Sequence, residues 1–254
     1  MISTASWFSD RVENYILYRP SYPAAVAALL CREAGLQAGS TVADLGSGTG
    51  ILTQMFLSRQ MIVNAVEPNA AMREGAERLL GSDPHFVSHS GTAEHTGLPD
   101  HCADLITAAQ AFHWFDRAAA RLEFDRILKP GAIAALIWNE RRVTSTAFLR
   151  DYEAFLNTHA TDYGEVNHSN IQEDAIAAFF APLPVHQASF ENRQIFDYAG
   201  LEGRLMSSSY APAEGHPGYV PMIAALRELF DRHAVDGKVS FDYDCRVWWA
   251  RWGQ

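Results

Sequence analysis

The segment from Val42 to Gly50, with the sequence VADLGSGTG, constrains the fold of this chain more than any other. Residues 41–45 form a short apolar run that predicts a buried parallel strand, and residues 51–57 predict the start of a helix. Glycines at alternate positions let the backbone turn sharply and let a ligand lie against the main chain. The first N–H groups of the helix have no partner within it and can face that ligand. The segment therefore predicts a strand–loop–helix unit of the kind that holds nucleotide-like ligands in doubly wound sheets.

Two acids beside this unit indicate which ligand it holds. The glycines follow neither the dinucleotide pattern G-x-G-x-x-G nor the phosphate-binding pattern that ends in Lys-Ser or Lys-Thr. Asp44 would repel a pyrophosphate but attract a cationic amino group. Glu67 ends a predicted strand over 61–66, where a carboxylate can accept both hydroxyls of a ribose. S-adenosylmethionine (SAM) carries an amine, a sulfonium and an adenosine, so it offers a partner to both acids. The alternative, a glycine-rich turn with two structural acids, is disfavoured.

The chain resembles the class I SAM-dependent methyltransferases in three places. These are the glycine loop, the pair Glu67-Pro68 and the segment AQAFHWF over 109–115. It is most similar to small-molecule methyltransferases of the trans-aconitate and quinone-pathway type, and the likeness extends to 15–23 near the start. The resemblance implies a doubly wound, mostly parallel seven-stranded sheet with an antiparallel final strand and an inserted helical cap. It also implies SAM as cofactor and S-adenosylhomocysteine (SAH) as product.

Alternating strands and helices run through the first half of the chain, and such alternation requires a parallel sheet with right-handed crossovers. Asn69 and Asp116 are expected to cap two of the helices, and Lys129-Pro130-Gly131 is expected to end the second of them. The remaining expected strands of this half are 86–88, 103–109 and 132–138, and the expected helices include 69–80.

We expect a single methyltransferase domain over 1–254, with N-terminal helices within 1–38. These helices span 8–17 and 24–34, and Gly35 ends the second. Helices over 172–180 and 220–233 and strands over 185–190 and 239–252 are also expected, with the two strands pairing antiparallel. The segments 140–170 and 197–235 are expected to be insertions that cover the cofactor and shape the acceptor pocket.

The resemblance assigns cofactor contacts to positions in several motifs. Arg19 is expected to bind the SAM carboxylate, with a surface salt bridge as the alternative. Asp44 is expected to orient the methionine end, and a backbone carbonyl near Gln110 to receive the amine. Thr92 stands where the family often has Asp, so the backbone N–H of Ala93 is expected to meet the adenine, with Glu94 either nearby or solvated. The full set of expected cofactor-binding residues is Arg19, Asp44, Gly46, Gly48, Glu67, Pro68, Thr92, Ala93 and Gln110, whereas Gly50 is expected to pack helix on strand.

His113 is the candidate catalytic residue, because it follows a predicted strand at the edge where open sheets bind ligands. With an ordinary pKa near 6.5, it could remove a proton from a hydroxyl acceptor. The alternative is a ring packed among Phe112, Trp114 and Phe115 that shapes the pocket. A carboxylate acceptor would need no base, so the motif does not decide between these roles.

The composition limits the partners. The chain carries 30 acidic residues against 20 Lys and Arg, a net charge of −10, and its one basic pair is Arg141-Arg142, which disfavours nucleic acid as the acceptor. No apolar run is long enough for a membrane span. Cys31, Cys102 and Cys245 lie far apart, which argues against a metal site and favours a reducing compartment, the cytoplasm.

These features predict methyl transfer from SAM to a small-molecule acceptor, with O- or carboxyl-methylation favoured and C- or N-methylation still possible, in a monomer or homodimer. Two other functions remain open at this point. One is a nicotinamide-dependent oxidoreductase, against which the glycine spacing argues. The other is a SAM-binding protein with the same fold and no turnover.

Overall fold

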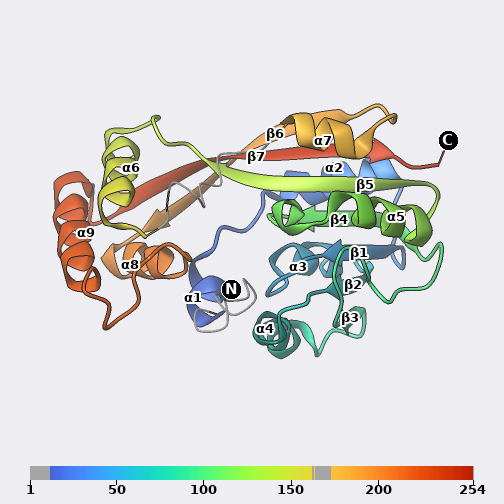
Figure 1. Cartoon of the computed structure of the whole chain (residues 1–254), viewed down its shortest axis with the longest axis horizontal. Helices are drawn as coiled ribbons and strands as arrows, with labels where there is room; N and C mark the ends of the chain where they lie inside the picture. Colours follow the sequence, from blue (N-terminus) through green and yellow to red (C-terminus); the bar gives the residue numbers. More distant parts are fainter. Residues whose placement is uncertain (1–11, 162, 164–172, 254) are drawn as a thin grey trace.

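The computed structural model describes residues 12–161, 163 and 173–253, and its centre is a sheet in the order β3-β2-β1-β4-β5-β7-β6 (Figure 1). The strands are β1 Thr41–Leu45, β2 Ile62–Val66, β3 Phe86–His89, β4 Ala103–Ala109, β5 Leu128–Arg141, β6 His186–Phe196 and β7 Val239–Arg251. Strands β1 to β5 are parallel to one another, and β7 runs antiparallel to both of its neighbours, β5 and β6. This mostly parallel, seven-stranded α/β sheet with an antiparallel final strand confirms the predicted fold class.

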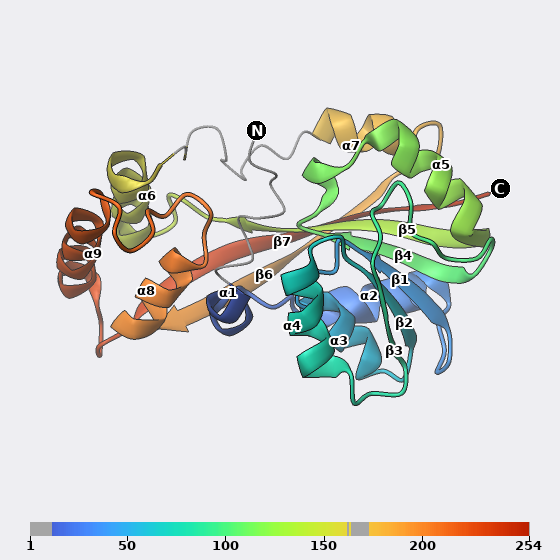
Figure 2. The same ribbon diagram turned by 60° about the horizontal axis from the view of Figure 1, so that its bottom comes forward.

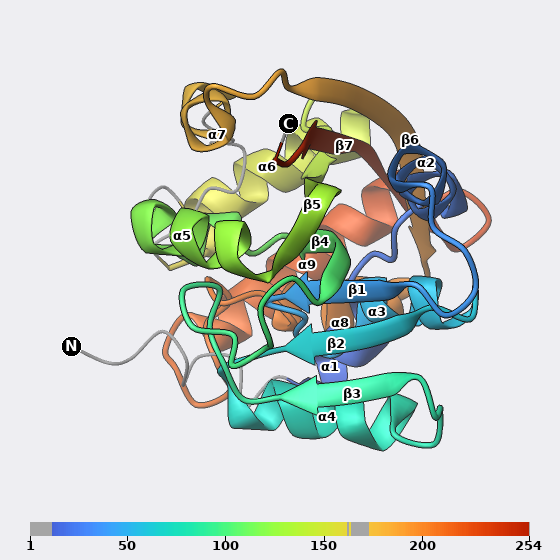
Figure 3. The same cartoon turned by 90° about the vertical axis from the view of Figure 1, so that its right-hand side faces the viewer.

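Helices cover both faces of this sheet (Figure 3). The helices are α1 Val12–Tyr18, α2 Ala24–Ala34, α3 Ile51–Leu57, α4 Ala70–Leu80, α5 Arg117–Ile127, α6 Ala147–His159, α7 Glu173–Phe180, α8 Tyr198–Met206 and α9 Tyr219–His233. Successive strand residues point to opposite faces, so Val42 packs with α2 and α3, whereas Ala43 packs with α5 and α7. The hydrophobic core therefore lies on both faces of the sheet, and the central strands are buried between its two halves.

A helical cap of α6, α8 and α9 lies beyond the carboxyl ends of the central strands, and α1 lies between the cap and the sheet (Figures 1 and 2). The cap has a hydrophobic core of its own, which β6 and β7 reach by running on past the sheet. The ring of Phe241 on β7 packs edge-to-face against Phe148 and Tyr152 on α6, with centroids 5.3 and 4.9 Å away. No helix within the described ranges is long and apolar enough to cross a membrane.

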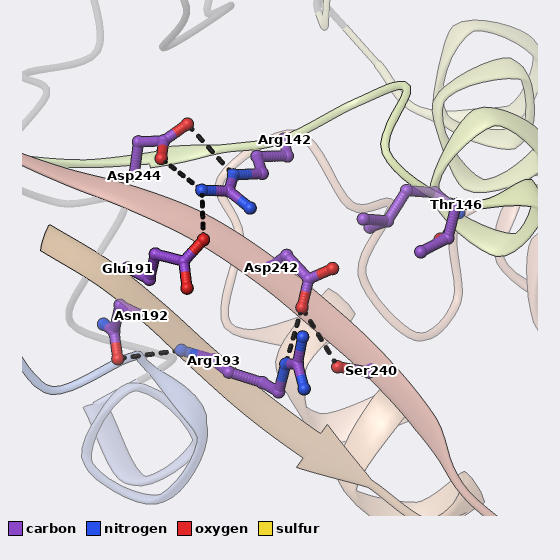
Figure 4. A network of polar contacts seen from close by, with 9 residues as sticks. Arg142, Thr146, Glu191, Asn192, Arg193, Ser240, Asp242 and Asp244 are labelled. Atoms are coloured by element: carbon purple, nitrogen blue, oxygen red, sulfur yellow. Dashed lines mark hydrogen bonds and ion pairs between the residues drawn. The ribbon is translucent and has the colours of Figure 1, made fainter.

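Ion pairs fasten the extended strands to one another (Figure 4). Arg142, directly after β5, donates to both carboxylate oxygens of Asp244 on β7, at 2.7 and 3.1 Å, and to Glu191 on β6, at 3.1 Å. Further along, Arg193 on β6 donates to Asp242 on β7 at 2.8 Å. Because exposed pairs contribute at most about 1 kcal/mol each, these contacts favour one register of the strands more than they stabilise the fold.

The predicted helix ends are confirmed. The side chain of Asn69 accepts a hydrogen bond from the N–H of Met72 in the first turn of α4, and Asp116 accepts from two N–H groups in the first turn of α5. Gly35 ends α2 in the left-handed conformation with φ of 65°. A capping side chain accepts hydrogen bonds from the first turn of its own helix, and a glycine tolerates positive φ. Both effects are local, so these helix ends could be predicted from the sequence.

The expected turn at Lys129-Pro130-Gly131 was wrong. α5 ends at Ile127, and β5 already begins at Leu128, which pairs with Ala103 on β4. The register shifts before the next pair, so the extra residues are taken up by an irregularity in the strand. Gly131 has φ of 77° there, and its N–H donates to the carbonyl of Trp252.

The ends of other predicted elements differ from those in the structure. The strand expected over 185–190 runs to Phe196, because it pairs with β7 over its whole length as far as Val239. The antiparallel pairing of these two strands is confirmed. Part of the helix expected over 8–17 lies outside the described residues, and its described part is α1. The segment 140–170 contains α6, and the segment 197–235 contains α8 and α9.

Candidate functional site

The loop between β1 and α3 presents main-chain atoms to a cavity. Gly46 and Gly48 have φ of 66° and 58°, and the N–H groups of Gly46 and Ser47 donate to the carbonyl of Val66 at the end of β2. A Cβ on Gly46 would lie 2.5 Å from the Cβ of Ala111. This position therefore excludes a side chain both by its backbone conformation and by the space around it.

Asp44 lies beneath the loop rather than in the cavity. It is 1% exposed, and its two oxygens accept hydrogen bonds from the hydroxyls of Thr53 at 2.7 Å and Thr107 at 2.9 Å. Burial raises the pKa of Asp44 to about 6, and the two hydroxyls oppose that shift. Gly50 is also a packing position, since a Cβ there would lie 2.5 Å from Leu80 on α4. Both residues therefore set the position of the loop from below, and the predicted role of Asp44 in orienting the methionine end, directly or through water, stays a prediction.

Glu67, directly after β2, faces the glycine loop. Its Oε2 accepts a hydrogen bond from the N–H of Gly48 at 2.9 Å, and its Oε1 accepts one from the N–H of Asn69 at 2.8 Å. Burial raises the pKa of Glu67, and these two hydrogen bonds partly offset the rise. A carboxylate has about four lone-pair sites, so each oxygen can still accept one hydroxyl of a ligand.

A cavity of 290 Å³, which we call the loop cavity, lies over the glycine loop. It brings together seven of the residues predicted to bind the cofactor: Gly46, Gly48, Glu67, Pro68, Thr92, Ala93 and Gln110. The other residues that line it are Tyr15, Asn69, Met72, Glu94, Ala109, Ala111, Trp114 and Phe115. The cavity is therefore built at the carboxyl ends of β1, β2 and β4, where open parallel sheets bind ligands.

The segment after β3 forms one wall of the loop cavity. Thr92 and His95 exchange two backbone hydrogen bonds of 3.1 and 3.2 Å, which folds the segment back on itself around the buried Ala93. Glu94 accepts a hydrogen bond from the N–H of Asp116 at 2.8 Å. Glu94 is thus neither a freely solvated charge nor remote from the cavity, since it lines the cavity and ties it to the start of α5.

A second cavity of 120 Å³, which we call the arginine cavity, lies toward the helical cap. Its lining includes Arg19, Arg141 and Arg204, together with residues from both expected insertions. The remaining lining residues are Tyr15, Pro20, Tyr22, Ile51, Gln110, His113, Trp114, Asn139, Glu140, Val143, Tyr163, Ser209, Tyr210 and Tyr243. Tyr15, Gln110 and Trp114 line both cavities, so the two adjoin.

Gln110 is held at the boundary between the two cavities. Its backbone has φ of 56°, its N–H donates to the carbonyl of Ile137, and its side-chain amide donates to the carbonyl of Asn139, both at 3.0 Å. These two hydrogen bonds to β5 fix a conformation that is uncommon for a residue with a Cβ. Strain that is held in this way clusters at ligand sites.

Arg19 lines the arginine cavity and not the loop cavity, and its predicted bond to the SAM carboxylate stays a prediction. Its guanidinium donates to the carbonyl of Ser207 at 2.8 Å and lies 5.0 Å from the ring centroid of Tyr15. Burial and the charge of Arg204 lower the pKa of Arg19. The alternative of a surface salt bridge is wrong, because no carboxylate in the described chain lies within ion-pair distance of Arg19.

His113 also lines the arginine cavity. Its ring lies 4.5 Å from that of Trp114 and 5.1 Å from that of Trp138, measured between centroids. Desolvation among these rings lowers the pKa of His113 to about 4, although the side chain remains accessible from the cavity. The imidazole is therefore neutral at physiological pH, a state in which it can accept a proton but is a weak base.

Two of the residues that give the arginine cavity its charge were not predicted from the sequence. Arg141 had stood out only as half of a basic pair, and Arg204 is one charged residue on an ordinary helix. Arg204 reaches the arginine cavity because of its neighbour Gly203, where a Cβ would overlap the ring of Tyr18. The glycine lets α1 and α8 approach closely, and this approach places Arg19 beside Arg204. No local pattern in the sequence signals such a contact.

Comparison with known proteins agrees with this geometry. A family described as a methyltransferase domain matches residues 43–136, which include the glycine loop, Glu67 and His113. An uncharacterised methyltransferase of Geobacillus thermodenitrificans is 30% identical over 159 residues, which cover 61% of this chain and 69% of that protein. The chain belongs to the class I SAM-dependent methyltransferase family.

Two further similarities show how far the membership extends. An uncharacterised methyltransferase of Mycobacterium bovis is 39% identical over 134 residues, so the match spans 53% of this chain and about half, 52%, of that methyltransferase. A solved structure from Anaeromyxobacter dehalogenans, provisionally described as a type II methyltransferase, superposes with a TM-score of 0.71 at 25% identity over 92% of this chain and 98% of that one. The methyltransferase fold thus includes the cap region, while the sequence similarity concentrates in the sheet.

Proposed function

We propose that this chain is an enzyme that transfers a methyl group from SAM to a small-molecule acceptor. The single observation that carries the proposal is that a cavity of the methyltransferase fold adjoins a second cavity through Tyr15, Gln110 and Trp114. A group-transfer enzyme needs two ligands in contact, and two adjoining cavities meet that need.

The residues of the loop cavity fit SAM. Gly46 and Gly48 have no side chain, so a ligand in the loop cavity can approach the main chain closely. A Cβ on Gly46 would clash with Ala111, which also lines the cavity. Glu67 is assigned the two ribose hydroxyls, and the wall at Thr92 and Ala93 the adenine. When bound, SAM would supply the methyl group of its sulfonium: a lone pair of the acceptor would bond to the methyl carbon in line as the carbon–sulfur bond breaks and SAH leaves.

The cationic and aromatic groups of the boundary orient the reacting end. We assign the SAM carboxylate to Arg19, which extends from the arginine cavity beside Tyr15, and we assign the amine to the main chain near Gln110. Asp44 acts as a positioning residue through the loop above it. The aligned ligands then need little further help, since orientation alone lowers such barriers by roughly 7–11 kcal/mol.

The acceptor side carries one group that can take a proton. His113 is neutral and lines the arginine cavity, so we assign it the proton of a hydroxyl acceptor. A carboxylate acceptor would have no proton to lose, and His113 would then shape the pocket only. O- or carboxyl-methylation is therefore favoured over C- or N-methylation.

The setting of the protein follows from its charge and thiols. A net charge of −10 disfavours a nucleic acid as the acceptor. The cysteines Cys31, Cys102 and Cys245 are free thiols, which supports a reducing compartment, so we place the enzyme in the cytoplasm. We also propose that residues 1–254 act as one domain, in a monomer or homodimer, on acceptors of the kind used by trans-aconitate or quinone-pathway methyltransferases.

Calorimetry with SAH and with NADH tests the cofactor. We expect SAH to bind one site per chain and NADH to give no saturable heat. Glu67→Gln should weaken SAH binding by about 10- to 100-fold, because a charged acceptor of two hydrogen bonds is lost. Glu74→Gln, an exposed residue on α4, serves as the matched control and should bind normally. Binding of NADH in place of SAH would support an oxidoreductase and contradict the proposal.

Incubation with methyl-labelled SAM and fractionated small-molecule extract tests the transfer. The label should move to a small molecule in an enzyme-dependent way. If SAH binds but no fraction takes the label, the chain is a SAM-binding protein without turnover on those molecules, and the enzymatic part of the proposal fails.

A further inference from the structure

Three arginines that line the arginine cavity each have one buried nitrogen atom without a partner among the described residues. Arg204 is 8% exposed, and the side chain of Arg141 is 13% exposed. The buried nitrogens Nε of Arg19, Nη1 of Arg141 and Nε of Arg204 make no hydrogen bond with any described residue. Buried donors are nearly always satisfied, so three of them around one cavity indicate that a ligand satisfies them.

The charges of these arginines are only partly balanced. Arg141 forms an ion pair of 2.5 Å with Glu153, whereas Glu140, which also lines the cavity, is paired at 3.5 Å with Arg246. Arg19 and Arg204 form no ion pair with any carboxylate of the described residues. Counted over the described residues, the cavity therefore carries two positive charges in excess.

The groups that these two arginines contact are neutral, and they include the ring of Tyr15 for Arg19 and the side chain of Tyr243 for Arg204. Arg19 donates to the carbonyl of Ser207, and Arg204 donates to the hydroxyls of Ser207 at 3.4 Å and Ser208 at 3.1 Å. Burying a charge with so little compensation destabilises a protein. A bound anion compensates it, and a guanidinium presents a planar fork that matches a carboxylate.

We infer that the acceptor is a small organic acid whose carboxylate binds Arg204 and the unpartnered Nη1 of Arg141. The inference rests on the proposed function, which assigns Arg19 to the carboxylate of SAM and so leaves one excess charge for the acceptor. One excess charge matches a monoanionic carboxylate better than a phosphate dianion. The carboxylate is an anchor at the cap side, while His113, which lines the same cavity, faces the body of the acid.

The size of the cavity agrees with this class of ligand. At 120 Å³ it admits a compact acid rather than a polymer or a lipid chain. Tyr163, whose hydroxyl donates to Glu153 and accepts from Arg141 at 2.9 Å, holds the Arg141 side chain in place. The anchor is thus positioned before the ligand binds, which reduces the entropy lost on binding.

Thermal shift and calorimetry on the SAH-saturated protein test the inference. The probes are benzoate and succinate, with methyl benzoate and dimethyl succinate as neutral counterparts and inorganic phosphate as a second anion. We expect at least one of the two carboxylates to bind and raise the melting temperature, and both esters to have no effect. Binding of phosphate alone, or equal binding of acids and esters, would overturn the inference.

Variants locate the anchor. Arg204→Gln should weaken carboxylate binding by about 10- to 100-fold and leave SAH affinity unchanged. Without ligand its melting temperature should hold or rise, because a buried unpaired charge is removed; a purely structural arginine would lower it. Arg204→Lys keeps the charge without the fork and should bind with intermediate affinity. The control Arg193→Gln removes an exposed arginine paired with Asp242 and should behave as wild type.

The outcomes separate the inference from the proposed function. Loss of carboxylate binding in Arg204→Gln with normal SAH binding supports both. Normal SAH binding with no effect of either acid on the wild type overturns the inference alone. A wild-type protein that does not bind SAH overturns the proposed function, whatever the acids do.

Discussion

The two adjoining cavities are built in opposite ways. The loop cavity is built around the glycine loop, and Glu67 and Glu94 are the charged residues that line it in the described chain. The arginine cavity consists of side chains, and three of them are arginines. An acidic half therefore faces the cationic and hydroxyl groups of the methyl donor, and a basic half faces an anionic acceptor.

The difference also concerns how each cavity is assembled. The loop cavity comes from the ends of neighbouring parallel strands, whose register is fixed by the sheet. The arginine cavity is lined by residues of α1, β5, α8 and β7, which meet because the long strands run on to the cap beyond the end of the sheet (Figure 2). The loop cavity therefore depends on backbone geometry, whereas the arginine cavity depends on long-range packing.

The largest expected effect breaks the loop cavity alone. Gly46→Ala introduces a Cβ 2.5 Å from Ala111 at a positive φ, so SAH affinity should fall by more than about 100-fold. Gly97→Ala is the matched control, because Gly97 also has positive φ but nothing lies within 4 Å of its Cβ position. If both variants lose SAH binding equally in calorimetry, strain rather than the close approach is responsible.

His113 tests the acceptor side on the reaction found by labelling. His113→Ala should lower kcat by about 100-fold for a hydroxyl acceptor, while SAH affinity stays unchanged. Because the pKa of His113 is about 4 rather than the ordinary 6.5, the wild-type kcat/KM should stay flat from pH 5.5 to pH 8. A bend near pH 6.5 that disappears in the variant would show that the ring is not desolvated as the structure has it.

Gly203 tests the packing that assembles the arginine cavity. Gly203→Ala places a Cβ in the ring of Tyr18, and the free energy of unfolding should fall by about 1–3 kcal/mol. Carboxylate binding should weaken more than SAH binding, because α8 carries the proposed anchor Arg204, whereas most residues assigned to SAM lie in the loop cavity. Replacing Tyr18 by Leu in the same chain should restore part of the stability in denaturant unfolding; no restoration would contradict the assigned contact.

The smallest effect concerns Asp44. Its pKa is about 6 in the folded protein against 3.8 when unperturbed, so its contribution to stability is present below pH 3.8 and lost as the pH rises through 6. The wild type should therefore lose about 1 kcal/mol relative to Asp44→Asn between pH 5 and pH 7. A difference that stays constant with pH, measured by urea unfolding, would contradict the raised pKa.

The sequence predicted the loop cavity well because its signals are local. Gly46 and Glu67 each act through a conformation or a charge that follows directly from a few neighbouring residues. The role of Asp44 was harder to predict, since Thr53 and Thr107, which take up its oxygens, come from α3 and β4. Arg204 could not be predicted at all, because its meaning depends on Gly203 meeting Tyr18 across nearly the whole chain. The cap boundaries were equally dependent on long-range pairing, as the extension of β6 along β7 shows.

A crystal structure with SAH tests the central claim most directly. We expect the adenosyl group in the loop cavity with both ribose hydroxyls on Glu67, and the sulfur directed toward Gln110 and the arginine cavity. An empty loop cavity in crystals that hold SAH elsewhere, or a ribose remote from Glu67, would contradict the account.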